Sequence, residues 1–160
     1  MMKAIDLFNA LGDRFRNFGN DAESQRVIDE ACRANEWFTP HEIRRAVTAI
    51  ADRMLRRDAL ETWLSGYPVP VAAPRRVLVI MAGNIPLVGF FDLLCVVASG
   101  HRCLVNPSAK DSVLIRHTVE LLRTIDPDVA IEFYDGSSPV DAVIATGSNN
   151  ARRAFRCRYA

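Results

Sequence analysis

The sequence predicts an α/β protein in which an N-terminal helical segment precedes a parallel sheet. The first 65 residues carry amphipathic helical stripes. Residues 77–81 form an unbroken apolar run that ends at Gly83-Asn84, which is typical of a strand buried on both faces, as in parallel sheets. A mostly apolar helical segment and a second apolar run, Arg102–Val105, follow it. The order of strand, turn, helix and strand indicates a parallel crossover.

Four helices are predicted in the N-terminal region, residues 1–66. The first has an apolar stripe made of Leu7, Leu11, Phe15 and Phe18. The second ends near Asn35, and the third begins at Thr39-Pro-His-Glu42, a capping box with proline at the first helical position. The fourth stops at Gly66. Residues 67–74 hold three prolines, so we expect an extended connector and a boundary between sub-regions there.

Residues 75–160 are predicted to be the first part of the α/β domain. After the first strand, Pro86 is expected to open a helix that ends at Gly100. Asp111 is a predicted N-cap for the next helix, and strands are expected at 130–134 and 141–145. The last ten residues begin like a helix and show no stop signal. We therefore expect this domain to be incomplete.

The composition of the chain argues against several classes of protein. The chain is 49% apolar and 24% charged with a net charge of +1, which is ordinary for a globular protein and gives no indication of nucleic-acid binding. Its four cysteines have no C-x-x-C spacing and follow no signal peptide, so we expect reduced thiols in a cytoplasmic protein. The longest apolar stretch is interrupted before the ~18 residues that a membrane span needs. Three scattered histidines predict no metal site.

Three predicted strand ends carry small or polar residues just before a helix: Gly83-Asn84, Asn106-Pro-Ser108 and Thr146-Gly-Ser148. Parallel strands bring these ends to one edge, where open α/β sheets bind ligands. Small residues let a phosphate approach the backbone N–H groups of a helix N-terminus. We expect a nucleotide site here, although the G-x-G-x-x-G fingerprint is absent. Turns with a purely structural role remain the alternative.

Four separated segments carry a family resemblance: Met81–Leu87, Ser99–His101, the Lys110-Asp111 pair and Ala145–Asn150. In order and spacing they resemble acyl-CoA reductases of the LuxC type, in the aldehyde dehydrogenase superfamily. The resemblance runs from about Trp37 to the last residue. It implies a Rossmann-like, aldehyde dehydrogenase-like cofactor domain. It also implies an enzyme that reduces an acyl-CoA or acyl-carrier thioester to an aldehyde.

The resemblance implies roles for individual residues. Asn84 matches the amide that helps to form the oxyanion hole, where a neutral donor stabilises a tetrahedral oxygen. Its structural alternative is to cap the helix that Pro86 opens. Met81 and Ala82 would line the nicotinamide through their backbone.

Further matches concern the rest of the cofactor. Asn106 and Ser108 match the segment that holds the adenosine ribose, and Thr146, Gly147 and Ser148 match the pyrophosphate turn. Many relatives have glutamate where this chain has Ala109, and its loss favours NADPH over NADH. Most relatives have lysine where this chain has Asn106, and the absence of that lysine weakens the expected preference for NADPH.

The family's nucleophilic cysteine lies downstream, in a separate domain, and none of the four cysteines here matches it. Cys95 and Cys103 are expected in the core, and Cys157 lies in a basic cluster after the last turn. We therefore expect this chain to be the N-terminal part of a longer enzyme, inactive alone and homo-oligomeric at full length. The alternative is a non-catalytic nucleotide-binding or regulatory α/β module.

Overall fold

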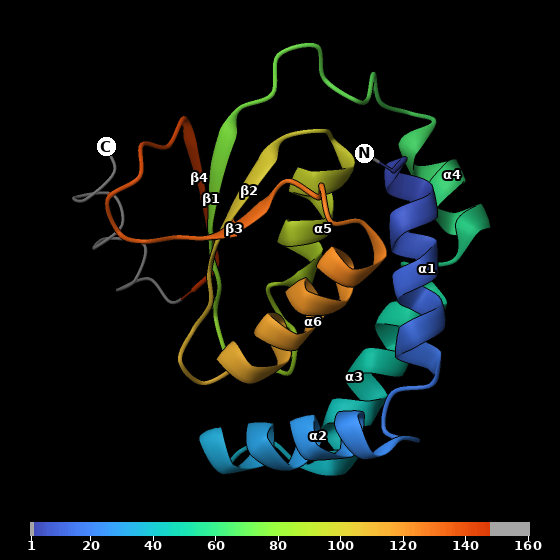
Figure 1. The fold of residues 1–160 in the computed structure, drawn as a ribbon, viewed down its shortest axis with the longest axis vertical. Coiled ribbons are helices and arrows are strands. Elements are labelled where there is room, and N and C mark those ends of the chain that lie inside the picture. The colour runs from blue at the N-terminus through green and yellow to red at the C-terminus, as the bar shows by residue number, and fades with distance from the viewer. Residues whose placement is uncertain (1, 148–160) are drawn as a thin grey trace.

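A computed structural model describes residues 2–147 of the 160-residue chain (Figure 1). The elements within this range follow one another in the order α1 (Ala4–Arg16), α2 (Ala22–Ala34), α3 (Pro40–Arg53), α4 (Arg57–Leu64), β1 (Arg76–Ile80), α5 (Phe90–Ala98), β2 (Arg102–Asn106), α6 (Ser112–Ile125), β3 (Ile131–Phe133) and β4 (Ala142–Ala145). The α/β class predicted from the sequence is confirmed. None of the helices in this part of the chain is both long and apolar enough to cross a membrane.

The four N-terminal helices lie where their apolar stripes predict them. Leu7, Leu11 and Phe15 are buried on one face of α1, whereas Phe18 follows the end of that helix. Gly19 then reverses the chain with a φ of +90°, a conformation that a side chain would strain. At the start of α3 the Thr39 hydroxyl accepts the Glu42 N–H at 3.2 Å, which confirms the predicted cap.

Within residues 2–147 the sheet has four parallel strands in the order β3-β2-β1-β4. The crossovers through α5 and α6 carry the chain outward from β1 to β2 and β3. The chain then returns to pair β4 with the other side of β1. The strand order therefore reverses between β1 and β4, the position at which open α/β sheets bind ligands.

Helix α5 ends as predicted but begins later than predicted. At its C-terminus the Gly100 N–H bonds to Val97 O at 3.0 Å and the His101 N–H to Val96 O at 3.1 Å, a Schellman motif with Gly100 at φ +87°. The predicted start at Pro86 is wrong, because the helix begins at Phe90. A loop of residues 81–89 instead separates β1 from α5.

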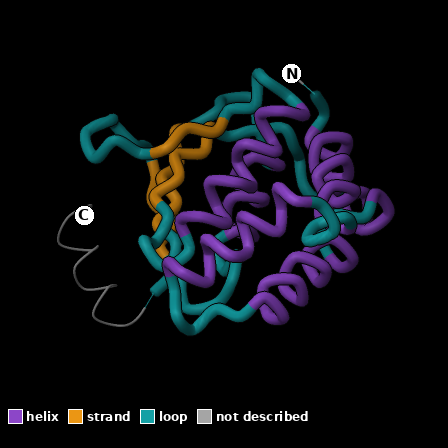
Figure 2. The backbone as a smooth tube through the Cα atoms, turned by 60° about the horizontal axis from the view of Figure 1, so that its bottom comes forward, coloured by secondary structure: helices purple, strands orange, loops and turns teal. Residues whose placement is uncertain are grey.

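The two faces of the sheet are covered differently. Figure 2 shows the helices gathered on one side of the strands. On that side Val77 and Val79 join the main core, and on the other side Leu78 and Ile80 pack against Tyr134 and neighbouring apolar side chains. All four of these β1 residues are buried, as the unbroken apolar run predicts for a central parallel strand.

One hydrophobic core links the N-terminal helices to the sheet. Phe90 of α5 is fully buried, with its ring centroid 6.4 Å from that of Phe8 and 5.9 Å from that of Phe15 in α1. Aromatic pairs at this spacing add to the stabilisation from burial. The division into residues 1–66, 67–74 and 75–160 stays a prediction, and in the described residues the first and last of these regions share their main core.

Candidate functional site

The carboxyl ends of β1, β2 and β4 meet at one edge, as predicted. Ile80 pairs with Asn106 on one side and with Ala145 on the other. The ladder continues one step further, because Met81 N–H bonds to Asn106 O at 3.0 Å and Thr146 N–H to Ile80 O at 3.1 Å. Backbone pairing thus brings the predicted residues Met81, Asn106 and Thr146 together at the point where the strand order reverses.

Asn84 lies exposed in the loop 81–89, and its side chain makes no hydrogen bond to the residues the structure describes. The alternative that Asn84 caps a helix at Pro86 is wrong, since α5 starts at Phe90. Leu87 explains the later start, because its φ of +58° belongs to the left-handed region and interrupts a right-handed helix. The Asn84 amide is therefore free to donate to a ligand.

Two buried polar side chains hold this loop from distant parts of the chain. The Asn35 Nδ2 donates to Gly83 O at 3.2 Å, and the Leu87 N–H donates to Asp111 Oδ2 at 2.8 Å. Asn35 is 5% exposed and Asp111 is 2% exposed. Buried hydrogen bonds of this kind fix backbone geometry, because either partner left alone would lose its hydration without compensation. The loop on both sides of Asn84 is thus pinned.

Asp111 does not cap α6 through its side chain, although the sequence predicts that cap. Its side chain makes no capping bond to α6, because Oδ2 is used by Leu87 N–H, and Oδ1 is buried without a partner among the described residues. Burial raises the pKa of Asp111 to about 7, and the bond from Leu87 N–H opposes that rise. The sequence predicts neither the role of Asn35 nor this use of Asp111, since nothing in local spacing indicates a partner 48 or 24 residues away.

The segment after β2 packs tightly against the loop. A Cβ on Gly83 would lie 2.6 Å from Ser108 Oγ and 2.7 Å from Ser108 Cβ, so glycine is needed at this contact. Met81 is 4% exposed and its side chain lies against Gly89, while Ala82 is half-buried. Any contact that Met81 makes with a ligand would therefore come from its backbone.

The turn after β4 opens to solvent. Thr146 and Gly147 are exposed, and the Thr146 hydroxyl donates to Asp92 Oδ2 in α5 at 2.8 Å. This bond ties the turn to the first turn of α5 and places a carboxylate beside it. Ser148, the third predicted pyrophosphate contact, lies outside the described residues, as does Cys157.

The three described cysteines are free, and none is activated as a nucleophile. Burial raises the pKa of Cys103 to about 12, and it also raises the pKa values of Cys95 and Cys32. Raised values keep these sulfurs protonated at neutral pH, and the thiol is a poor nucleophile. The expected core placement is confirmed for Cys103, which is buried, whereas Cys95 is only half-buried.

The described histidines show no catalytic geometry. His101 Nδ1 accepts the Arg75 N–H at 3.0 Å, which places the ring proton of its neutral form on Nε2. The ring of His117 lies 5.8 Å from that of Phe18, and burial lowers the pKa of His117. Residues 2–147 contain no group of three or more His, Cys, Asp or Glu side chains that could hold a metal ion.

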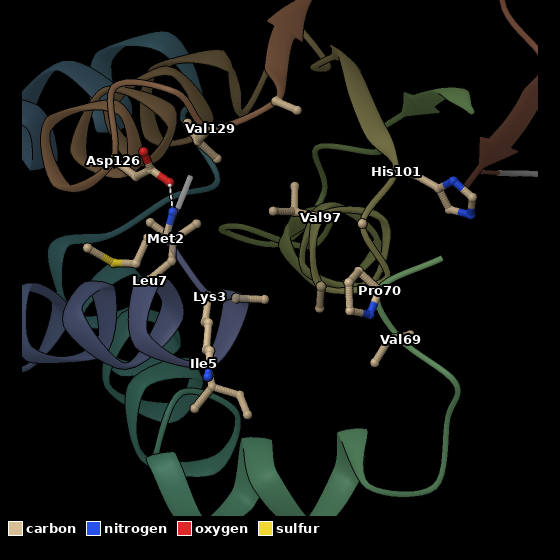
Figure 3. A pocket seen from close by; sticks show the side chains of 14 residues that line it. Met2, Lys3, Ile5, Leu7, Val69, Pro70, Val97, His101, Asp126 and Val129 are labelled. Atoms are coloured by element: carbon tan, nitrogen blue, oxygen red, sulfur yellow. Dashed lines mark hydrogen bonds between the residues drawn. The ribbon is translucent and has the colours of Figure 1, made fainter. Parts of the chain in front are cut away.

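A cavity of about 490 Å³ lies at the opposite, amino-terminal edge of the sheet (Figure 3). Its walls are mostly apolar and include Leu7 from α1, Val97 from α5 and Pro70 from the connector. The bond from Met2 N–H to Asp126 Oδ2, at 2.8 Å, lies along one side. No residue predicted for the nucleotide site lines this cavity, so the two edges are separate features.

Comparison with protein-family models finds no match to this chain, and comparison with curated proteins finds none either. The candidate site therefore consists of a pinned loop, a free amide at Asn84, the half-buried segment 106–108 after β2 and the exposed turn after β4.

Proposed function

We propose that this chain is the N-terminal part of an acyl-CoA reductase that uses NADPH to reduce a fatty acyl thioester to an aldehyde. The observation that carries the proposal is the exposed, unpaired amide of Asn84 beside the junction of β1, β2 and β4. An amide in this position suits a developing oxyanion, because it donates a hydrogen bond and adds no charge. The two pins at Gly83 and Leu87 would keep that donor pre-positioned.

The remaining residues would bind the cofactor, which supplies the hydride. The open turn at Thr146-Gly147 gives a diphosphate room to approach the backbone, and the segment Asn106–Ser108 offers polar groups to a ribose. The nucleophilic thiol would come from outside residues 2–147, because burial raises the pKa of each of the described cysteines. NADH is the less favoured cofactor, since no carboxylate occupies position 109 to repel a 2′-phosphate.

A thermal melt with NADPH, NADH or neither tests the cofactor site. Ligand at about 100 times its Kd adds about 2.7 kcal/mol to the free energy of unfolding, so a clear rise in Tm is expected. Gly147→Glu places a carboxylate at the diphosphate turn and should abolish the shift. Gly66→Glu is the matched control, because Gly66 is exposed and a Cβ there would touch only Trp63 O, at 3.9 Å.

If neither dinucleotide raises the Tm, the proposed function is wrong. A shift that survives Gly147→Glu would move the site away from this edge. The chain alone should form no aldehyde from acyl-CoA and NADPH, and aldehyde formation would overturn the placement of the nucleophile elsewhere.

A non-catalytic nucleotide-binding or regulatory module is the second candidate. It is favoured by the same protonated thiols, which leave the described residues without a nucleophile. The transcript separates the two candidates: a reading frame that continues into a cysteine-bearing domain supports the reductase, and a stop codon after Ala160 supports the module.

A further inference from the structure

Among the described residues, the cation Lys110 lies at the carboxyl edge of the sheet, beside Gly83. Its Nζ lies 4.4 Å from the centre of the Trp37 ring, within the range of a cation–π contact. Trp37 is 65% exposed although it is a large aromatic residue. The two residues come from different loops: Lys110 follows β2, and Trp37 lies between the end of α2 and the start of α3 (Figure 1).

The pair is held in place through Gly83. Asn35 Oδ1 accepts the Trp37 N–H at 3.1 Å, while Asn35 Nδ2 donates to Gly83 O. On the other side, a Cβ on Gly83 would lie only 3.1 Å from Lys110 Cβ. The loop that presents Asn84 therefore lies between the stem of Lys110 and the Asn35 side chain, which also bonds to the Trp37 backbone.

The charge of Lys110 is not neutralised by the described part of the chain. No carboxylate within residues 2–147 forms an ion pair with its ammonium group. A contact with an aromatic face uses no acceptor, so the ammonium keeps its hydrogen-bond donors for a ligand. Lys110 is also the only cation in the segment 106–111, because Asn106 and Ala109 are neutral.

We propose that Lys110, held against Trp37, binds the 2′-phosphate of the adenosine half of NADPH and so determines the preference for NADPH over NADH. This inference rests on the proposed function, and it names a residue that selects the cofactor. The segment Asn106–Ser108 would hold the ribose, and Lys110 follows it on the same loop. A dianionic phosphomonoester matches a lysine that has no carboxylate partner.

Titration calorimetry of four proteins tests the proposal: the wild type, Lys110→Met, Lys110→Arg and Lys3→Met. Lys110→Met should raise the Kd for NADPH about tenfold, or about 1.4 kcal/mol, and change the Kd for NADH less than twofold. Lys110→Arg should keep most of the preference. Lys3→Met, which removes a lysine beside the cavity at the opposite edge, should change neither value.

A second measurement reads the Trp37 ring directly. The sequence contains two tryptophans, so Trp63→Phe leaves Trp37 as the single emitter. Adenosine 2′,5′-bisphosphate should change its emission by drawing the ammonium from the ring, and inorganic phosphate at the same concentration should not. An equal response to inorganic phosphate would mean a general anion site and would overturn the proposal.

The outcomes separate the two hypotheses. A preference for NADPH that persists in Lys110→Met overturns this inference and leaves the proposed function standing. Equal affinity for NADPH and NADH overturns this inference and the cofactor preference, and leaves the proposed reductase activity standing. Failure of both dinucleotides to bind overturns the proposed function and this inference with it.

Discussion

Two carboxylates at opposite edges of the sheet make the same bond in different surroundings. Asp111, at the carboxyl edge, accepts the Leu87 N–H at 2.8 Å, and Asp126, at the amino edge, accepts the Met2 N–H at 2.8 Å. Burial dominates at Asp111 and raises its pKa to about 7. Hydrogen bonds dominate at Asp126, where the N–H groups of Met2 and Asp128 lower the pKa.

The contrast shows that the buried carboxyl group has a different role at each edge of the sheet. At the amino edge, a polar side chain joins backbone groups of chain segments around an apolar cavity, and its charged form is the stable one. At the carboxyl edge, a carboxyl is held away from water with Oδ1 unpaired in the described structure. Unpaired buried polar groups cost stability and are characteristic of sites where geometry matters for function.

The largest expected effect is on the pH dependence of the free energy of unfolding, to which Asp111 and Asp126 contribute with opposite signs. The carboxyl of Asp111 ionises near pH 3.8 in the unfolded chain and near 7 in the folded protein. The folded state therefore holds the extra proton between these values, and the stability from this group falls as pH rises, by roughly 1.4 kcal/mol per pH unit at most. Above pH 7 the loss is complete. Urea unfolding from pH 4.5 to 8 measures it.

Asp111→Asn is the control, because it keeps an acceptor for Leu87 N–H and removes the titration. The difference between wild type and variant isolates Asp111 from His117, whose pKa is lowered by burial, so that the stability from His117 rises with pH up to its ordinary pKa of 6.5. The stability from Asp126 is fully present above its ordinary pKa of 3.8 and is lost as pH falls through the lowered pKa of the folded protein. If the free energy of unfolding falls with pH equally steeply in wild type and in Asp111→Asn, Asp111 is ionised in the folded protein.

The next effect concerns the glycines at the two edges. Gly100, at the amino edge, is needed for its φ of +87°, whereas Gly83, at the carboxyl edge, is needed because Ser108 lies against it. Gly83→Ala should reduce the free energy of unfolding by about 2 kcal/mol, as overpacking does. Gly66→Ala, at an open position, should change it by less than about 0.5 kcal/mol. Chemical denaturation measures both.

A double-mutant cycle identifies the cause. Ser108→Gly removes both atoms nearest the new Cβ, so the combination with Gly83→Ala should recover most of the loss. Ser108→Ala keeps the Cβ at 2.7 Å and should recover little. If Ser108→Gly and Ser108→Ala restore the same amount of stability to Gly83→Ala, the clash with Ser108 is not the cause of the loss.

These residues also mark the limit of prediction from sequence. The helices and strands follow from periodicity and caps that lie within a few residues of one another, such as Thr39 with Glu42 or Gly100 with Val97. The convergence of Met81, Asn106 and Thr146 follows from parallel pairing. The late start of α5 does not, because it depends on a bond between Leu87 and Asp111, 24 residues apart. Pro86 alone favours an earlier helix, and a tertiary contact overrides it.

The smallest effect on stability is expected at Asn84. This prediction tests whether the residues that stabilise the carboxyl edge differ from the residues that are exposed there to a ligand. Asn84 is exposed and its side chain makes no hydrogen bond to residues 2–147, so Asn84→Ala should change the free energy of unfolding by less than about 0.5 kcal/mol. Asn35→Ala leaves Gly83 O and Trp37 N–H without their buried partner and should cost about 1–3 kcal/mol. In the proposed acyl-CoA reductase, Asn84→Ala should lower kcat by about 10²- to 10³-fold, the usual cost of one oxyanion donor. A large loss of stability at Asn84 would mean that its amide belongs to the fold and is not free for the reaction.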